Sequence, residues 1–278
     1  MMGLARSTYY YNPVEDSRSI TDEVLRDMIE KVQLTFPGYG YRRLYHHFLK
    51  QGHRINSKRL KRVMREYNLY SCLKKWMRPR GARTLIQLRH PNLIKGLKLT
   101  APNQVWATDI TFIKLRYEFV YLSAIIDVYT RKIVGWSISK NLGHEFCLES
   151  IKLAVKKAKP PKGLIHHSDR GVQYVCEPYV QYLLDQEMKI SMSRPGTPQE
   201  NAFIEAFFKT LKREEVYFKE YQNLKTVLKH LPNFIEEVYN RKRLHSSLGY
   251  ESPVDFENKI LKLKPADRPV QKIWGKPV

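Results

Sequence analysis

The stretch VWATDITFI, residues 105–113, predicts a β-strand that carries one misplaced charge. Its β-branched and aromatic residues are typical of strands that are buried in a sheet. Asp109 interrupts this apolar run, and an unpaired carboxylate in the middle of a sheet is costly to bury. We therefore expect Asp109 to have a charged partner or a metal ion beside it.

The segments that follow predict an α/β domain. Two more strand-like runs, at residues 119–129 and 132–139, complete an antiparallel meander. Helical spacing then alternates with short apolar strands, which predicts a mixed sheet with helices packed on it. The expected helices span residues 144–158, 174–186 and 199–217, and the expected strands span residues 163–167 and 189–193.

The first part of the chain predicts a smaller helical domain. Apolar residues recur at helical spacing in residues 22–34, and a second short pattern contains Leu44 and Phe48. Asn56 and Ser57 offer an N-cap for a third helix. The basic side chains of that helix suit contact with phosphates or a major groove, the alternative being a merely solvated basic face. These residues are Lys58, Arg59, Lys61, Arg62 and Arg65.

The charge of the chain is strongly positive and unevenly placed. The net charge is +22 over 278 residues, and residues 1–100 alone hold 21 Lys or Arg against 7 acids. Such an excess predicts a polyanionic partner, with nucleic acid as the first candidate. The basic run continues through Lys74 and Lys75 into a predicted basic linker at residues 71–100.

Two classes of protein are excluded by composition. No apolar run approaches the ~18 residues needed to cross a bilayer, and the N-terminus lacks the apolar core of a signal peptide, so we expect a soluble, intracellular protein. The cysteines, Cys72, Cys147 and Cys176, form no C-x-x-C pair. Neither a disulfide framework nor a zinc knuckle is expected.

Two further carboxylates complete a candidate site. Asp169 falls where the fourth strand ends, and Glu205 interrupts an apolar stretch of the long helix. If the first and fourth strands lie side by side and this helix packs across them, the carboxylates of Asp109, Asp169 and Glu205 come together. Three hard oxygen donors favour Mg²⁺ or Mn²⁺ over zinc. Two such ions about 4 Å apart would support phosphoryl transfer.

Five motifs in order make the chain resemble a known family. Asp109, Asp169 and Glu205 match the DD(35)E spacing of retroviral integrases and bacterial transposases. The sequence motifs around these acids are similar to those of the second-reading-frame (OrfB) transposases of the insertion-sequence-three family, and the resemblance covers residues 9–256. The motifs are WATDIT (106–111), HSDRGVQY (167–174), SMSR (191–194), ENAFIEAFFKTLK (200–212) and YNRKRLHSSLGY (239–250).

The resemblance implies a ribonuclease H-like fold of five mixed strands preceded by a helix-turn-helix domain. It implies that Asp109, Asp169 and Glu205 are the catalytic, metal-binding residues. The implied partners are double-stranded DNA (element terminal repeats and target), further copies of the chain, and an upstream first-frame product fused through frameshifting; the implied setting is the bacterial cytoplasm and nucleoid. The expected divisions are residues 1–20 (extension), 21–70 (helix-turn-helix-like), 71–100 (basic linker), 101–218 (catalytic core) and 219–278 (C-terminal helix and tail).

Other residues have competing interpretations. Asp127 also interrupts a strand, but the nearby Arg131 and Lys132 favour a structural ion pair. Glu200 competes with Glu205, although helix capping explains it. Arg243 in the C-terminal motif has two interpretations. It either lines the path of the DNA or belongs to a packed tail that closes the fold. The remaining predicted DNA contacts are Arg170, Asn201, Lys209 and Lys212, and the predicted supporting residues are His167 and Gln173.

The leading functional hypothesis is a Mg²⁺-dependent DNA transposase that nicks element ends and then joins the freed 3′-hydroxyl to a second phosphodiester. A catalytically silent DNA-binding regulator is the first alternative, and the three intact acids argue against it. The second alternative is an RNA-binding protein or ribonuclease of the same fold. It is disfavoured because sequence-specific RNA recognition mostly uses aromatic-rich sheets or loops.

Overall fold

The computed structural model of the chain describes residues 20–36, 38–69, 90–116, 118–194 and 197–273. The chain divides into two compact units, Met1–Cys72 and Leu73–Val278, each with its own core. No helix in the described ranges is long and apolar enough to span a membrane.

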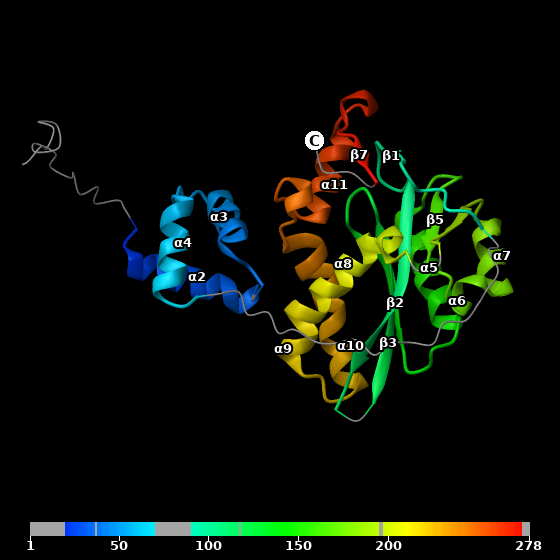
Figure 1. The fold of residues 1–278 in the computed structure, drawn as a ribbon, viewed down its shortest axis with the longest axis horizontal. Helices are drawn as coiled ribbons and strands as arrows, with labels where there is room; N and C mark the ends of the chain where they lie inside the picture. Colours follow the sequence, from blue (N-terminus) through cyan, green and yellow to red (C-terminus); the bar gives the residue numbers. More distant parts are fainter. Residues whose placement is uncertain (1–19, 37, 70–89, 117, 195–196, 274–278) are drawn as a thin grey trace, which may run out of the picture. The chain divides into compact units, whose positions relative to one another are not determined.

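The described part of the first unit forms the three predicted helices, α2 (Asp22–Thr35), α3 (Tyr41–Lys50) and α4 (Ser57–Glu66) (Figure 1). Side-chain oxygens of Thr21 and Asn56 cap α2 and α4 by accepting hydrogen bonds from backbone N–H groups of the first turn. The helices pack through apolar residues at helical spacing. The buried residues include Leu25, Ile29, Leu44, Phe48, Leu60 and Val63.

The second unit is built on a mixed five-stranded sheet, as predicted, with strand order β4-β3-β2-β5-β6. The first three strands form the antiparallel meander, and β5 and β6 add to it in parallel. Figure 1 shows that β2 and β3 are much longer than β5. The strands are β2 (Val105–Lys114), β3 (Phe119–Asp127), β4 (Ile133–Ser139), β5 (Ile165–Ser168) and β6 (Lys189–Met192).

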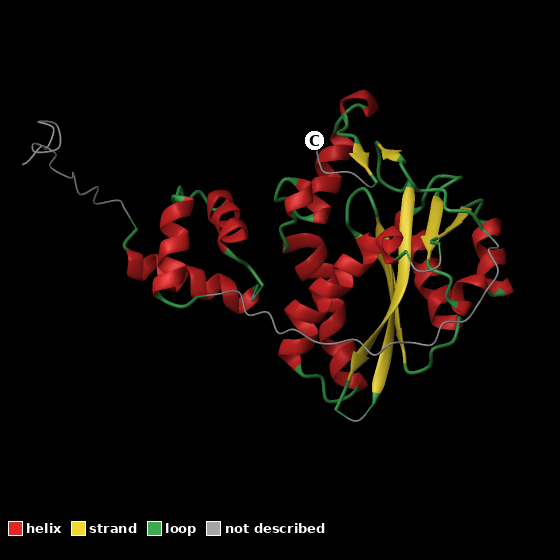
Figure 2. Ribbon diagram, in the orientation of Figure 1, coloured by secondary structure: helices red, strands yellow, loops and turns green. Residues whose placement is uncertain are grey.

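Helices cover both faces of this sheet (Figure 2). The apolar residues of α5 (Glu145–Ala158) and α7 (Glu177–Asp185) pack with Trp106 and Ile125 on one face. The opposite face holds α8 (Ala202–Leu211), which packs with Val105 and Ala107. The other elements are β1 (Lys98–Leu99), α6 (Val172–Val175), α9 (Tyr217–Lys219), α10 (Leu224–Asn233), η3 (Phe234–Lys242), η4 (Ser246–Leu248), α11 (Pro253–Lys262), η5 (Pro265–Asp267) and β7 (Gln271–Lys272).

The long helix predicted for residues 199–217 is not one continuous α-helix. It begins as a 3₁₀ turn, η1 (Pro198–Asn201), becomes α-helical in α8, and widens into a π-helical turn, η2 (Lys212–Val216), before α9. Apolar periodicity does not distinguish these helix types, because the hydrogen-bonding pattern changes by only one residue per turn.

The C-terminal segment closes the α8 face through buried polar contacts. Asn240 on η3 donates to the carbonyl of Ile133 at 3.0 Å and accepts from its N–H at 2.9 Å, which satisfies the first residue of β4. The short strands β1 and β7 pair antiparallel, with Lys98 opposite Lys272. These contacts join residues that lie more than a hundred positions apart in the sequence.

Gly135 permits the close approach of α5 to β4. A Cβ atom at this position would meet the Ser150 carbonyl oxygen and would lie 2.7 Å from the Cβ of Ala154. Neither neighbour is the end of a flexible side chain, so the helix and strand would have to separate.

We therefore expect Gly135→Ala to lower the free energy of unfolding by about 1–3 kcal/mol, the usual cost of overpacking. The measurement is denaturant-induced unfolding followed by circular dichroism. Gly143→Ala is the control, because a Cβ there would meet only the flexible end of Glu145. Equal stability losses in the two variants would contradict this account of α5 packing.

Candidate active site

Strand register places the two aspartates level with each other. The parallel pairing of β2 with β5 sets Val105 opposite Ile165 and Ala107 opposite His167. The same offset, continued two residues, brings Asp109 level with Asp169. Because β5 ends at Ser168 while β2 continues to Lys114, Asp109 lies on β2 just beyond the end of its neighbour.

Asp169 belongs to the turn that follows β5. Its Oδ1 accepts a hydrogen bond of 2.8 Å from the N–H of Gly171. Burial raises the pKa of the Asp169 carboxyl, and that hydrogen bond partly offsets the effect. The residue still reaches solvent, although protein atoms crowd its carboxyl. A cation placed beside Asp169 would favour the ionised form.

Glu205 lies on α8, the helix that covers the same face of the sheet as Asp109. Val105, Ala107 and Ile113 face the α8 cluster, and alternation along β2 puts Asp109 on that side as well. The Glu205 side chain is 18% exposed, and its Oε2 lies 3.7 Å from Nζ of Lys209, one helical turn away.

Asn201 anchors the start of α8 to the strand that carries Asp109. Its Nδ2 donates a 3.0 Å hydrogen bond to the carbonyl of Thr108. Its Oδ1 is buried and has no hydrogen-bond partner among the described residues. A buried acceptor left unsatisfied is costly and indicates a missing donor or cation nearby. Asn201 thus ties the start of α8 to β2.

His167 is a support for the end of β5. Its two ring nitrogens lie 2.8 Å from Ser191 Oγ and 2.9 Å from Ser193 Oγ, and burial lowers the pKa of His167 to about 4. A neutral imidazole fixed in this way holds the neighbouring strand β6. His166 points to the opposite face, where its Nε2 lies 3.0 Å from the Tyr179 hydroxyl.

The serines that hold His167 were missed at the sequence level. Ser191 lies on β6 and Ser193 follows directly after its end, and the spacing of two positions lets both project to the same side. That spacing beside a histidine of a neighbouring strand was the available signal. Tyr174 was missed as well, and its hydroxyl lies 3.4 Å from Thr108 Oγ1, next to Asp109.

Glu200 and Asp127 have structural roles. Although burial opposes it, hydrogen bonds from the backbone and side chain of Arg194 help to lower the pKa of Glu200 to about 2. Asp127 lies opposite Trp106 in the β2–β3 register, three positions from the Asp109 pair, and therefore on the other face. The competing assignments of these two acids as metal ligands have no support in the geometry.

The predicted ion pair of Asp127 with Arg131 or Lys132 is not found among the described residues. Its carboxylate accepts hydrogen bonds from the N–H groups of Asn103 and Thr130, each at 2.6 Å. Lys132 pairs with Glu257 at 2.5 Å, and the Arg131 guanidinium stacks 4.0 Å from the ring centroid of Phe203. Local backbone donors satisfy the acid, so no cation is needed beside it.

The donor set suits a hard divalent cation, since Asp109, Asp169 and Glu205 offer only oxygen atoms. However, no group of three or more His, Cys, Asp or Glu side chains within the described ranges is placed to hold a metal ion. Carboxylates without a cation between them repel one another, and Glu205 lies beside Lys209 instead. Within the described ranges, the three acids therefore do not form a preassembled metal cluster.

The predicted DNA contacts have mixed environments. On α4, Arg59 and Arg62 bind Asp22 at 2.7 and 2.6 Å. Lys58, Lys61 and Arg65 are exposed on the same helix, as is Lys209 on α8. Lys74 and Lys75 lie outside the described residues.

Arg170 and Gln173 form contacts within the protein. Arg170 Nε donates to the carbonyl of Ser193 at 2.8 Å, and Gln173 Nε2 donates to that of Leu142 at 3.2 Å. Both residues therefore tie the segment that follows β5 to neighbouring loops, and the supporting role of Gln173 stays a prediction.

The assignment of Arg243 to the DNA path is corrected by its burial. Arg243 is 4% exposed, and its Nε and Nη2 each donate a 2.8 Å hydrogen bond to the carboxylate of Glu214. The packed-tail alternative accounts for this residue, because a buried bidentate pair leaves no guanidinium surface for a phosphate.

The comparisons with known proteins agree with this architecture. The integrase core domain family matches residues 100–198 and a second integrase core family matches residues 186–253, while the HTH-like domain family matches residues 19–76. The chain is 36% identical to the transposase for insertion sequence element IS904 of Lactococcus lactis, over 86% of this chain and 96% of that protein.

A second relative is transposase InsF for insertion sequence IS3A of Escherichia coli, which is 30% identical over 94% of this chain and 93% of that protein. Among solved structures, a chain of the simian T-cell lymphotropic virus intasome shares 16% identity at a TM-score of 0.49, covering 86% of this chain and 79% of that one.

The mixed sheet, its two helical layers and the matched integrase core define a DDE-type polynucleotidyl transferase. The chain belongs to the IS3 family of insertion-sequence transposases, since its similarity to those transposases spans nearly its whole length.

The neutral His167 makes stability depend on pH. Its pKa is lower in the folded protein than its ordinary value of 6.5, so the unfolded chain takes up the proton first. Stability is therefore full above about pH 6.5 and falls as the pH drops toward 4, by up to about 1.4 kcal/mol per pH unit. We expect His167→Gln to flatten this dependence in denaturant titrations at pH 7.5, 6 and 5; an unchanged slope would contradict the assignment.

The buried pair of Glu214 and Arg243 predicts a large stability loss on removal of one charge. Glu214→Gln leaves a buried guanidinium without its partner, and we expect the free energy of unfolding to fall by about 3–5 kcal/mol. Glu237→Gln removes an exposed partner of Arg241 and should cost less than about 1 kcal/mol. Thermal and denaturant unfolding of both variants measure the difference; similar losses would show that burial of the pair is energetically irrelevant.

Proposed function

We propose that this transposase cleaves and joins the ends of its insertion sequence by phosphoryl transfer at Asp109, Asp169 and Glu205. The observation that carries the proposal is the parallel register of β2 and β5, since its offset, continued two residues past the pair of Ala107 and His167, would put Asp109 level with Asp169. Asn201 supports it further, because this residue fastens the helix of Glu205 to β2 one position before Asp109.

In this proposal the three carboxylates hold divalent cations, Mg²⁺ or Mn²⁺, and two ions per site suit the displacement reaction. The bound cations would supply the positive charge that activates an attacking oxygen and stabilises the leaving one. Glu205 would leave Lys209 to complete the ligand set, since these side chains lie 3.7 Å apart before a cation is present. Released in this way, Lys209 becomes available to a phosphate of the DNA.

The chain's own groups divide the remaining work. Asp109 and Asp169 define where the scissile phosphate lies, with water attacking first and the freed 3′-hydroxyl attacking second. His167 stays neutral and holds the end of β5 in place. The exposed cations of α4, with Lys58 and Lys61 among them, hold the terminal repeats of the element through its phosphates.

The wider setting follows from the same chemistry. Joining two DNA ends in one reaction calls for more than one copy of the chain on DNA, in the bacterial cytoplasm. Cooperation with an upstream first-frame product, through fusion or direct contact, would supply further end recognition. A catalytically silent DNA-binding regulator is the alternative; a paired set of activity and binding measurements separates it from the transposase.

The decisive variant is Glu205→Gln, which keeps the size of the side chain and removes its charge. We expect nicking and strand joining on a supercoiled plasmid with the element's own ends, in Mg²⁺ or Mn²⁺, to fall at least about a hundredfold. DNA binding should be retained, because the substitution removes one negative charge and leaves every Lys and Arg that can contact phosphates in place.

Glu149→Gln is the matched control, since Glu149 is exposed on α5, a helix of the other face. It should cut and join at the rate of the unmodified chain. If the chain binds DNA but does not cut, even with the upstream-frame product supplied, the regulator alternative holds and the proposal falls.

A further inference from the structure

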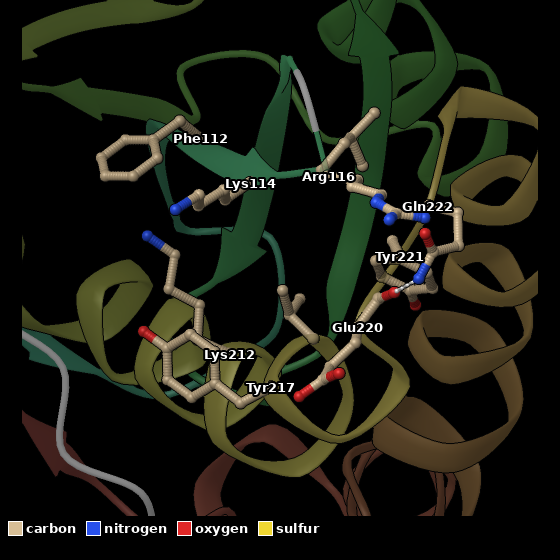
Figure 3. Close-up of a pocket in the computed structure, with 10 residues that line it drawn as sticks. Phe112, Lys114, Arg116, Lys212, Tyr217, Glu220, Tyr221 and Gln222 are labelled. Carbon is tan, nitrogen blue, oxygen red and sulfur yellow. Dashed lines mark hydrogen bonds between the residues drawn. The ribbon is translucent and has the colours of Figure 1, made fainter.

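A separate pocket of about 540 Å³ lies at the far end of β2 (Figure 3). One wall comes from the end of β2 and the turn after it, and the other comes from η2 and α9. Val216 and Tyr221 are buried and form its floor, where the Tyr221 hydroxyl donates a 2.7 Å hydrogen bond to Glu215. The side chains that give the pocket its character are Phe112, Lys114, Arg116, Lys212, Tyr217 and Glu220.

The pocket lies beside the part of β2 that extends beyond the end of its neighbour β5. Strand β5 ends at Ser168, so beyond Asp109 the described part of β2 is paired only with β3. Phe112 and Lys114 lie on this stretch of β2 and line the pocket from its edge. The π-helical turn η2 then widens the helix beside this edge, and π turns of this kind are frequent at functional sites.

The lining combines cations with flat rings. Lys212 Nζ lies 4.3 Å from the ring centroid of Phe112, and the Phe112 ring meets that of Phe119 edge to face at 5.8 Å. In Figure 3 the amino groups of Lys114 and Lys212 are drawn on the same side of the pocket, with the Phe112 ring above and the Tyr217 ring below. With Arg116 added, the described lining holds three cations and one carboxylate, that of Glu220.

This composition selects a ligand that is both anionic and planar. The volume falls within the range of about 300–1,000 Å³ that holds small organic ligands, so a phosphate alone would leave most of it unfilled. Aromatic rings beside cations are the means by which proteins hold single-stranded nucleic acid, with bases stacked on rings and phosphates on Lys or Arg. An acidic peptide would use the cations and leave the rings without a stacking partner.

The pocket is close enough to the carboxylates to act on the same strand. Phe112 lies three residues from Asp109 along β2, or about 10 Å, and alternation turns its side chain to the other face of the strand, so the pocket meets the carboxylates around the edge of β2. Lys212 lies seven residues from Glu205 along the helix, which is also about 10 Å. A paired strand advances about 3.4 Å per nucleotide along the duplex axis, and an unpaired strand can extend further, so the pocket lies within about three nucleotides of the phosphate that reacts.

We propose that this pocket binds one unpaired nucleotide of the DNA end, with its base against Phe112 and Tyr217 and its phosphate toward Lys114 and Lys212. The inference rests on the proposed function, because it takes the DNA strand at the carboxylates as its starting point. Opening the last base pairs of the element end would then be stabilised by the transposase itself, and the frayed strand would be held away from the reacting one.

The test compares two DNA probes on the full chain in EDTA, so that no strand is cut. One is a blunt duplex of about 20 base pairs from the element end. The other carries in addition a three-nucleotide single-stranded overhang, placed on either strand in separate probes, with 2-aminopurine as its last base. We expect the overhang probe to bind about tenfold more tightly, with its fluorescence quenched by stacking.

Phe112→Leu and Tyr217→Ala should each abolish this preference and the quenching, while blunt-duplex binding persists. Phe112→Leu keeps an apolar side chain of similar size, so the fold is retained; thermal unfolding checks this. Phe218→Ala is the matched control, because Phe218 is an aromatic residue next to Tyr217 that is 44% exposed and does not line the pocket. It should leave the preference unchanged.

Three results would overturn the inference. The first is an overhang preference that survives in both Phe112→Leu and Tyr217→Ala. The second is displacement of the overhang by a poly-glutamate peptide of equal charge as effectively as by single-stranded DNA, which would assign the pocket to acidic peptides. The third is equal binding of both probes by the unmodified chain, which removes the inference and leaves the proposed function intact; failure to bind either probe would remove both.

Discussion

The structure of the catalytic unit depends on one parallel strand pair that is unequal in length. β5 pairs with β2 through its first residues and stops at Ser168, whereas β2 continues for six residues beyond Thr108. Because the pairing stops there, the turn after β5 can place Asp169 beside Asp109 without burying either carboxylate in the sheet. The same inequality leaves the edge along which the second pocket forms. A longer β5 would cover both features.

The second constraint is the attachment of α8. Apolar contacts of Ile204 and Phe207 hold this helix on the sheet, but such contacts are non-directional and permit sliding. The hydrogen bond from Asn201 to Thr108 is directional, and it sets how far along β2 the helix begins. The position of Glu205 relative to Asp109 follows from that single bond and the helical rise. At its other end the helix widens into η2, which turns Lys212 toward Phe112.

Polar groups around the site are divided into fixed and adjustable sets. His167 is held by two serines, and Asp127, although a carboxylate, is held by backbone donors. Both groups are buried and satisfied; His167 fixes the end of β5 beside the site, and Asp127 fixes the sheet on its other face. Asp169 and Glu205 have fewer partners and reach solvent, and they are free to respond to a cation or a phosphate.

The sequence by itself determined the three helices of the first unit, the succession of five strands along the chain and the three acids of interest, because these follow from local periodicity, capping residues and misplaced charges. Only the tertiary structure decided which cations are available. Arg243 and Arg59 look alike in the sequence as basic residues in basic segments, yet Glu214 and Asp22 bind them through contacts across 29 and 37 positions. Likewise, the long helical pattern at residues 199–217 does not disclose its 3₁₀ and π turns, and nothing local indicates that β5 ends early enough to open a pocket beside Phe112. The local sequence shows which interactions a side chain can form, whereas contacts with residues distant in the chain decide whether that side chain is still available for a ligand.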